Sequence, residues 1–355
     1  MRQVDRAVRD LQLSGRVPGF QYVAVGAGST LVEACAGQAQ LSARPMALDT
    51  TMMAYSMSKT LTAAAVLQLV ERGRLGLEDA VSRHIPWQPY GTGVTVRGLL
   101  SHTAGLPNPI PLRWVHPAEQ HPEFDEGAAL RSVLSRHRRL VSRPGTRFAY
   151  SNIGYWLLGA LVEQVASEAF TSYVARHLFA PLELRTGEMA YAIPDPGRHA
   201  TGYLERFSAL SLFKPLLLDR RLIDRAVGRW VGLRAHYPDG PAFGGIVATA
   251  GAFGRFLQDQ LRARSRLCGE AAQARFFEQQ RTAHGLIPMT LGWHMGSLGP
   301  YRYFFKEGGG GGFRSMMRLY RSRGIGTVLM ANATTVKVGG ILDRLDNELL
   351  AATGC

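Results

Sequence analysis

The sequence has few cysteines and few lysines, and it has no long apolar stretch. Its three cysteines, Cys35, Cys268 and Cys355, are odd in number and far apart, so they predict neither a disulfide framework nor a CxxC metal site. No run of 18 apolar residues occurs, so we expect no transmembrane helix. Residues 1–19 are charged and lack the apolar core of a signal peptide, which predicts a cytoplasmic protein.

Lysine supplies only 4 of the 41 basic residues in a chain of net charge +14. No compact basic block alternates with aromatic residues, so we interpret the charge as arginine scattered over a solvated surface and expect no nucleic-acid partner. The histidines show no metal-ligand spacing, and we expect no metal and no cofactor. Hydrophobic residues make up 46% and charged residues 19% of the chain, which indicates a globular protein.

The most informative motif places a serine hydroxyl and a lysine amine three residues apart. Residues 55–60 read YSMSKT and begin an apolar run that ends near Gly73, which predicts a buried helix stopped by that glycine. Side chains at i and i+3 lie on one face of a helix, so Ser56 and Lys59 can meet. A lysine in a dry pocket can accept a proton, which makes Ser56 a candidate nucleophile with its own base.

A Ser-x-x-Lys match is weak on its own. A second one, Ser211 to Lys214, is followed by Pro215, which disfavours a helical conformation there. The alternative interpretation of Ser56 and Lys59 is a helix-capping serine and a solvated lysine. Further motifs are needed to decide between the two.

The pattern along the chain predicts strands and helices at both ends with a mainly helical segment between them. We expect helices over residues 1–16, 56–72, 153–166, 253–261 and 338–351, and strands over 20–25, 30–36, 301–305, 313–320 and 325–331. Alternation in 313–320 predicts a strand with one buried face. The chain is interpreted as a single unit, 1–355, with 1–75 and 248–355 in a sheet-containing lobe and 76–247 in a helical lobe. A cleft between the lobes is the expected ligand site, with 207–223 as a covering segment.

Two further motifs make the Ser-x-x-Lys pair more specific. Residues 150–152 read YSN at the entry to an apolar helix, and 306–308 read KEG at the end of a predicted strand. With these motifs the chain resembles the serine β-lactamase and penicillin-binding-protein superfamily, and more closely its class C-like branch, which includes β-lactamase-like carboxylesterases and D-aminopeptidase-type hydrolases. The stretches LLSHTAGL (99–106) and GGIVATA (244–250) are also similar to that branch. The resemblance covers about 17–334 and implies an α/β fold (α+β in some schemes), with an antiparallel sheet covered by helices on both faces and a mainly helical second lobe.

The resemblance implies a division of chemical roles. Ser56 would attack an acyl carbonyl and form an acyl-enzyme, after Lys59 or Tyr150 takes its proton. A tyrosine between the ammonium groups of Lys59 and Lys306 would have its phenolate favoured, so it could act as the base. Asn152 is expected to hydrogen-bond Lys59 and the substrate.

The resemblance also places the backbone N–H groups of Ser56 and Gly309 in an oxyanion hole. Gly308 and Gly310 are expected to line the substrate cleft, because glycines let a substrate approach the strand closely. Glu307 stands where the family usually has Thr or Ser, and an acidic residue there should repel a carboxylate, which weighs against penicillins. Lys306 stands where many esterase-like relatives have His or Trp, and this difference favours penicillins as substrates.

The sequence therefore predicts a serine hydrolase that acts on a small ester or amide, with a small-molecule ester, amide or lactam as its partner. The alternative is a true β-lactamase or D,D-peptidase of the penicillin-binding type. A more distant alternative is a catalytically silent relative that binds a ligand, in which Tyr150 and Asn152 form a helix-start turn without catalysis. His102 is interpreted as a structural histidine of a turn. The sequence predicts no oligomeric state.

Overall fold

The computed structural model describes residues 2–13, 15, 17–109, 114–206 and 220–353. Its largest element is a seven-stranded antiparallel sheet in the order β14-β15-β16-β17-β1-β2-β3. The strands are His294–Leu298 (β14), Tyr301–Gly310 (β15), Phe313–Tyr320 (β16), Ile325–Ala331 (β17), Gly19–Gly26 (β1), Thr30–Gln40 (β2) and Arg44–Pro45 (β3). The pairing of β17 with β1 joins the two ends of the chain, with Phe20 opposite Ala331. The predicted antiparallel sheet is confirmed.

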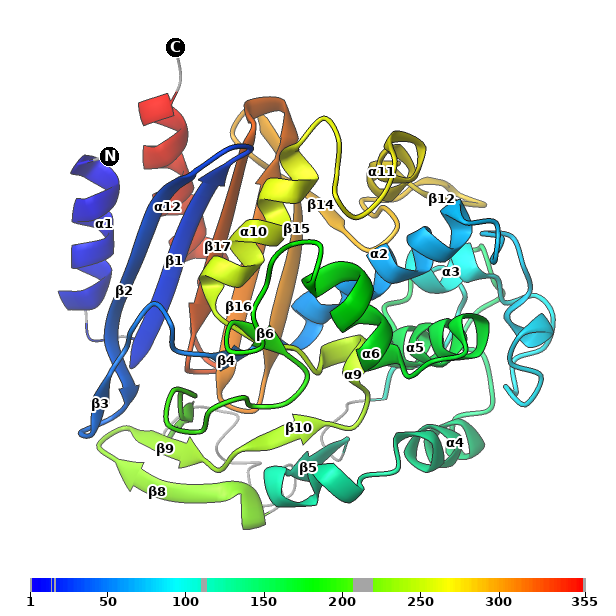
Figure 1. Cartoon of the computed structure of the whole chain (residues 1–355), viewed down its shortest axis with the longest axis horizontal. Helices are drawn as coiled ribbons and strands as arrows, with labels where there is room; N and C mark the ends of the chain where they lie inside the picture. Colours follow the sequence, from blue (N-terminus) through cyan, green and yellow to red (C-terminus); the bar gives the residue numbers. More distant parts are fainter. Residues whose placement is uncertain (1, 14, 16, 110–113, 207–219, 354–355) are drawn as a thin grey trace.

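Helices cover both faces of this sheet (Figure 1). α1 (Arg2–Leu13) and α12 (Val338–Thr353) lie on one face, and α10 (Ala250–Leu261) lies on the other. Neighbouring side chains of β16 therefore enter two different cores, Met316 on the α12 side and Met317 on the α10 side. The prediction that 313–320 has a single buried face is wrong, because this central strand is covered on both sides.

Arg318 shows how a charged side chain is accommodated in that doubly covered strand. It is buried, and its guanidinium donates to Asp346 Oδ2 at 3.1 Å and to Asp343 Oδ1 at 2.7 Å, both on α12. The hydroxyl of Tyr320 donates to the same oxygen of Asp346 at 2.8 Å. A buried charge is tolerated when it is paired in this way.

A second group of helices is centred on α2 (Ser58–Glu71), in which every residue from Ser58 to Leu69 is buried. It packs against α5, α9 and α11. The helices of this group are α3 (Val96–Leu100), α4 (Glu126–Arg136), α5 (Asn152–Ala166), α6 (Phe170–Val174), α9 (Pro241–Gly244) and α11 (Glu270–Phe277). α2 ends before Gly73, whose φ of +68° suits a glycine, as the sequence predicted.

Short strands also occur, several of them in the segment 76–247 where we expected mainly helices. They are β4 (Met52–Met53), β5 (Val115–Pro117), β6 (Met189–Ala190), β7 (Gly202–Glu205), β8 (Ile223–Val227), β9 (Trp230–Leu233), β10 (His236–Pro238), β11 (Val247–Ala248), β12 (Arg281–Thr282) and β13 (Gly285–Leu286). They form the sheets β4-β11-β6, β7-β9-β8, β10-β5 and β12-β13. Strands this short offer too few positions for alternation to be recognised. Most of the expected covering segment, 207–219, lies outside the described residues, and the division into two lobes stays a prediction.

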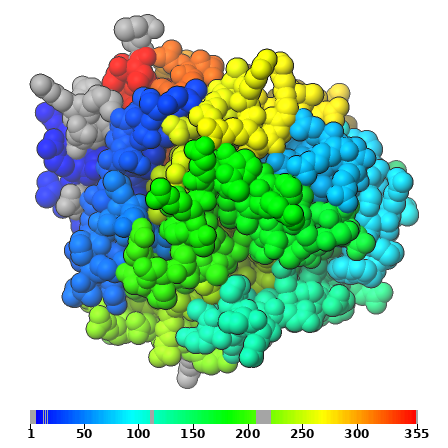
Figure 2. Space-filling model, in the orientation of Figure 1, coloured from blue at the N-terminus to red at the C-terminus, as the bar shows by residue number. Residues whose placement is uncertain are grey.

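The middle of the chain lies against the N-terminal part and against the region near α10 (Figure 2). In the space-filling view the green residues of the middle contact the blue residues of the N-terminal part and the yellow residues near α10 (Figure 2). Within the described ranges, no helix has the length and apolarity needed to span a membrane.

We predict that Arg318→Met lowers the free energy of unfolding by about 3–5 kcal/mol, because it leaves the buried carboxylate of Asp346 without its partner. Urea denaturation measures the change. The matched control is Arg83→Met, which removes an arginine whose ion pair with Asp79 is largely exposed and is expected to cost under about 1 kcal/mol. Equal losses in the two variants would contradict a special role for the buried network.

Candidate active site

Ser56 lies in a tight turn between β4 and α2. The turn, Tyr55–Met57, is a single 3₁₀ turn, and its residue Tyr55 has φ +46°, a conformation that is costly for a bulky side chain. The backbone N–H of Ala54 donates to the carbonyl of Ile246 at 2.8 Å, which fixes the turn against the chain entering β11. Ser56 is thus held, half-buried, at the start of a helix whose free N–H groups favour negative charge.

Lys59 is buried and its amine contacts three oxygens. Nζ lies 2.8 Å from Asn152 Oδ1, 2.7 Å from the carbonyl oxygen of Phe243 and 3.0 Å from Ser56 Oγ. Burial, followed by the charge of Lys306, holds the pKa of Lys59 well below its usual value. A neutral amine has two hydrogens, and the two carbonyl oxygens accept both. Its lone pair is then left facing the hydroxyl of Ser56.

Tyr150 and Asn152 reach this point from the start of α5. The hydroxyl of Tyr150 donates to Ser56 Oγ at 2.9 Å. Burial raises the pKa of Tyr150, although the bond to Ser56 works in the opposite direction. Burial works against the phenolate that the sequence led us to expect, because it favours the neutral form of the phenol and of both lysines. The phenol is placed as a proton donor to Ser56 Oγ.

Lys306 is buried on β15 and has no hydrogen-bond partner for its amine among the described residues. Nζ lies 5.4 Å from the ring centre of Tyr150 and 5.6 Å from that of Tyr155. Burial lowers the pKa of Lys306 to about 7. The structure therefore brings together the hydroxyl of Ser56, the amines of Lys59 and Lys306, and the phenol of Tyr150. Lys306 faces the ring of Tyr150 without a hydrogen bond to it.

The glycines of β15 lie directly against the turn that carries Ser56. A Cβ at Gly308 would overlap the carbonyl oxygen of Ala54 and would lie 3.1 Å from the backbone nitrogen of Ser56. The hydroxyl of Ser315 on the next strand also donates to the Ala54 carbonyl, at 3.2 Å. A Cβ at Gly310 would press on the ring of Tyr55. Only glycine allows this close approach of strand and turn.

Glu307 is placed differently from what the sequence suggested. Successive side chains of a strand point to opposite faces, so Glu307 points to the face opposite Lys306 and Gly308. Its carboxylate forms an ion pair with Arg314 of β16. Glu307 is therefore expected to repel a substrate carboxylate less strongly than the sequence suggested, because Arg314 compensates its charge.

Sequence reasoning missed two contributors to the site. The first is the backbone carbonyl of Phe243, which has no side-chain signal, although Phe243 directly precedes the motif at 244–250. The second is His294 at the start of β14, whose ring stacks on Tyr150 with centres 6.3 Å apart. Burial, with the charges of Lys306 and Lys59, lowers the pKa of His294 to about 3.

His102 supports the tyrosine from the other side. Its ring packs against that of Tyr150 at a tilt of 39° with centres 4.4 Å apart, and its Nδ1 accepts the backbone N–H of Ser151 at 3.2 Å. Its carbonyl oxygen accepts the N–H of Ala149 at 2.7 Å. These bonds hold the 149–151 stretch in place, which agrees with the structural role expected for His102.

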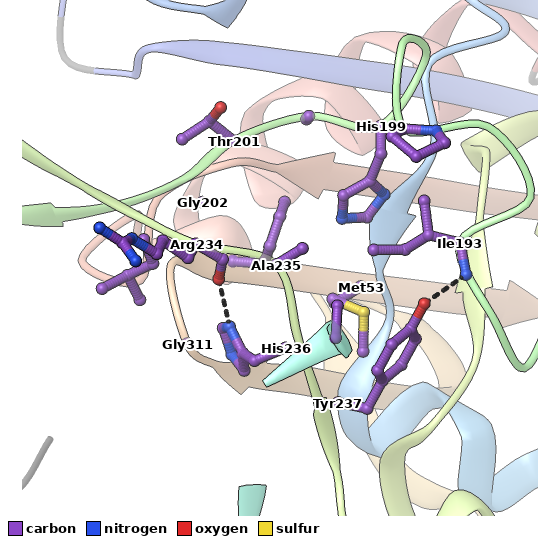
Figure 3. Close-up of a pocket in the computed structure, with 15 residues that line it drawn as sticks. Met53, Ile193, His199, Thr201, Gly202, Arg234, Ala235, His236, Tyr237 and Gly311 are labelled. Carbon is purple, nitrogen blue, oxygen red and sulfur yellow. Dashed lines mark hydrogen bonds between the residues drawn. The ribbon is translucent and has the colours of Figure 1, made fainter. Parts of the chain in front are cut away.

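A cavity of about 340 Å³ is lined by Met53 of β4, the strand that precedes the turn of the nucleophile. Figure 3 shows Met53 among Ile193, His236 and Tyr237 in this cavity. His236 connects it to the turn, because its Nε2 lies 3.0 Å from the hydroxyl of Tyr55. Among the described residues, no group of three or more His, Cys, Asp or Glu side chains is arranged to hold a metal ion.

The whole chain also matches a known family. The Beta-lactamase family model covers residues 4–351. The chain belongs to the beta-lactamase family. The superfamily resemblance expected from the three motifs is thereby confirmed, and the beta-lactamase fold explains why the first and last strands of the chain share one sheet.

Several proteins are similar to this beta-lactamase-family chain. Protein flp of Staphylococcus aureus (strain MW2) is 29% identical over 191 residues, which are 52% of this chain and 37% of flp. The D-amino acid amidase of Ochrobactrum anthropi SV3 in complex with L-phenylalanine superimposes with a TM-score of 0.83 at 19% identity, over 99% of each chain. A class C beta-lactamase superimposes with a TM-score of 0.76 at 17% identity, over 98% of this chain and 96% of the other. The matched part is thus well under half of flp, and the structural likenesses show the fold.

We predict that Lys306→Met stabilises the protein, and more so at low pH. The unfolded chain holds a proton on Lys306 up to its ordinary pKa, whereas the folded chain releases it near pH 7. Wild-type stability should therefore rise between pH 7 and pH 10. Below pH 7 the folded protein bears the full cost of burying the charged amine of Lys306. Denaturation should show a gain of roughly 3 kcal/mol for the variant at pH 6 that fades toward pH 10.

The control for this experiment is Lys337→Met, which removes an exposed lysine and should leave the pH profile of stability unchanged. If Lys306→Met gained the same stability at pH 6 and at pH 10, the lowered pKa of Lys306 would be refuted.

Proposed function

We propose that this protein is a serine hydrolase that forms an acyl-enzyme on Ser56. One observation carries the proposal: Ser56 Oγ lies within hydrogen-bond reach of both Lys59 Nζ, at 3.0 Å, and the Tyr150 hydroxyl, at 2.9 Å. A nucleophile needs a base to take its proton, and a leaving group needs an acid to supply one. The two neighbours of Ser56 fit these two roles.

Lys59 is the base in this mechanism and Tyr150 is the acid. The proton of Ser56 passes to the lone pair of Lys59 Nζ as Oγ bonds to the acyl carbon of the substrate. When the tetrahedral intermediate collapses, the bond to the leaving group breaks and that group takes the proton of the Tyr150 hydroxyl. Tyr150 regains a proton from the Lys59 ammonium, and water then releases the acyl group by the reverse sequence. Asn152 holds Lys59 in place throughout.

Backbone N–H groups of Ser56 and Gly309 form the oxyanion hole in this proposal. The position of Gly308 supports it, since this residue brings β15 to within contact of the Ser56 backbone. Beyond Phe305, no described strand pairs with β15 on the side of β14. A substrate can therefore lie along this free strand edge, next to the nucleophile.

The substrate class that we propose is a small ester or amide. A second candidate is a lactam or D,D-peptide substrate, and one observation favours it: Arg314 compensates the Glu307 carboxylate, so the main objection to a carboxylate-bearing substrate is weakened. Among the similar structures are a D-amino acid amidase and a class C beta-lactamase. Nitrocefin turnover, or lasting acylation by a labelled penicillin, would favour the second candidate. Hydrolysis of esters without either would favour the first.

We predict that Ser56→Ala lowers kcat for p-nitrophenyl acetate at least about 10³-fold, because it removes the group that forms the covalent intermediate. Steady-state absorbance assays measure the loss. The control, Ser135→Ala, removes an exposed serine hydroxyl on α4 and should retain full activity. Equal activity in wild type and Ser56→Ala would leave the catalytically silent, ligand-binding interpretation.

A separate prediction distinguishes the acid from the base. If Tyr150 protonates the leaving group, Tyr150→Phe should lower kcat about 10²–10⁴-fold on an alkyl ester such as ethyl acetate. It should lose far less on p-nitrophenyl acetate, whose leaving group needs no proton. Lys59→Met should lose activity on both substrates. Equal losses on both esters in Tyr150→Phe would instead identify Tyr150 as the base.

A further inference from the structure

A second cavity, of about 320 Å³, lies behind the proposed active site. Pro241 of α9 and the following residue Gly245 border it, and the carbonyl of Phe243 in the same helix accepts from Lys59. None of the proposed catalytic side chains lines it. We call this space the acidic cavity, after the two carboxylates in its wall, Glu126 and Asp239.

The acidic cavity has acidic side chains in its wall, whereas the chain as a whole is strongly basic. No Arg or Lys lines it, although the chain holds 41 basic residues and a net charge of +14. Burial raises the pKa of Glu126 to about 8, and the charges of Glu163 and Asp239 act in the same direction. The only group that lowers it is the indole N–H of Trp156, which donates to Glu126 Oε1 at 2.9 Å. Glu126 is thus a carboxylate without a cationic partner among the described residues.

A residue with an unsatisfied hydroxyl lines the same space. Tyr191 borders the acidic cavity, and its buried hydroxyl oxygen has no hydrogen-bond partner among the described residues. The charge of Glu126, which borders the same cavity, acts on this hydroxyl without a hydrogen bond to it. Buried polar groups are rarely left unpaired, and each exception points to a group that is missing. A donor placed between Glu126 and Tyr191 would satisfy both.

Four other residues of the wall carry flat rings that stack in pairs. His116 stacks on Phe124 with centres 3.8 Å apart, and His121 stacks on Tyr237 with centres 4.0 Å apart. Asp239 Oδ1 lies 2.9 Å from Nδ1 of His116, whose Nε2 lies 2.9 Å from His121. Asp239 is therefore already engaged with a histidine, and Glu126 is the acid left for a ligand. Aromatic faces attract organic cations.

We propose that the acidic cavity binds a small primary organic ammonium ion. Its charge pairs with Glu126, one of its N–H groups donates to the hydroxyl of Tyr191, and its hydrocarbon part lies against the stacked rings. A single metal ion is a poorer fit, because the space is far larger than an ion and the described residues provide no group of three metal ligands there. The site does not depend on the proposed catalysis.

The test uses n-butylammonium chloride and the full chain, with isothermal titration calorimetry and thermal shift at pH 9. Wild type is expected to bind and to gain thermal stability. Glu126→Gln keeps an acceptor for Trp156 and removes the charge, so binding should weaken at least about tenfold while the unliganded protein stays folded. Tyr191→Phe should weaken binding severalfold. Glu163→Gln changes an acid outside the cavity wall and is the matched control.

Two comparisons make the result specific. Binding should weaken from pH 9 to pH 6 as Glu126 takes up a proton, and n-butanol, which has the same chain without the charge, should not bind. Ser56→Ala should bind the amine as wild type does. The proposal is overturned if n-butylammonium fails to bind wild type, if Glu126→Gln binds equally, if magnesium or calcium chloride gives the same Glu126-dependent shift, or if Ser56→Ala abolishes binding.

Discussion

A lysine amine buried among carbonyl acceptors is the constraint on which the site depends. Lys59 reaches the interior from α2, and it is met there by the side chain of Asn152 from α5 and the backbone of Phe243 from α9. These three helices come from widely separated parts of the chain, and their packing around α2 brings the acceptors to one point. A buried ammonium would be costly, whereas a neutral amine with two accepted hydrogens is satisfied. The packing that builds the core therefore also favours the neutral amine that the proposed base requires.

The same principle explains how several bases share a small volume in a strongly basic protein. Burial lowers the pKa values of Lys59, Lys306, His102 and His294, and the charge of another base in the group acts in the same direction on Lys59, His102 and His294. They can lie together around Tyr150 only when most of them are neutral. A neutral surrounding removes the electrostatic support for a phenolate, which is consistent with the proposed role of Tyr150 as a proton donor.

The sequence predicted the parts of the fold that are long and periodic. The strands at 313–320 and 325–331 and the buried helix after Ser56 were found because their patterns extend over at least seven residues. The three motifs also predicted which side chains meet. The short strands of 76–247 were missed because two to five residues carry no readable period. The carbonyl of Phe243 and the positive φ of Tyr55 belong to the backbone, and no side-chain pattern reports them. The ion pair of Glu307 with Arg314 depends on strand register, which a motif does not specify.

The two cavities differ in how they are connected to the nucleophile. His236 lines the cavity of Figure 3 and is hydrogen-bonded to Tyr55 in the turn. A ligand that contacts His236 would therefore be one hydrogen bond away from the residue next to Ser56. The acidic cavity is separated from Lys59 by the rings of Trp156 and Phe243, which pack edge to face with centres 5.4 Å apart. Glu126 is not among the charges that shift the pKa of Lys59. We therefore expect a cation in the acidic cavity to leave the pKa of Lys59 largely unchanged.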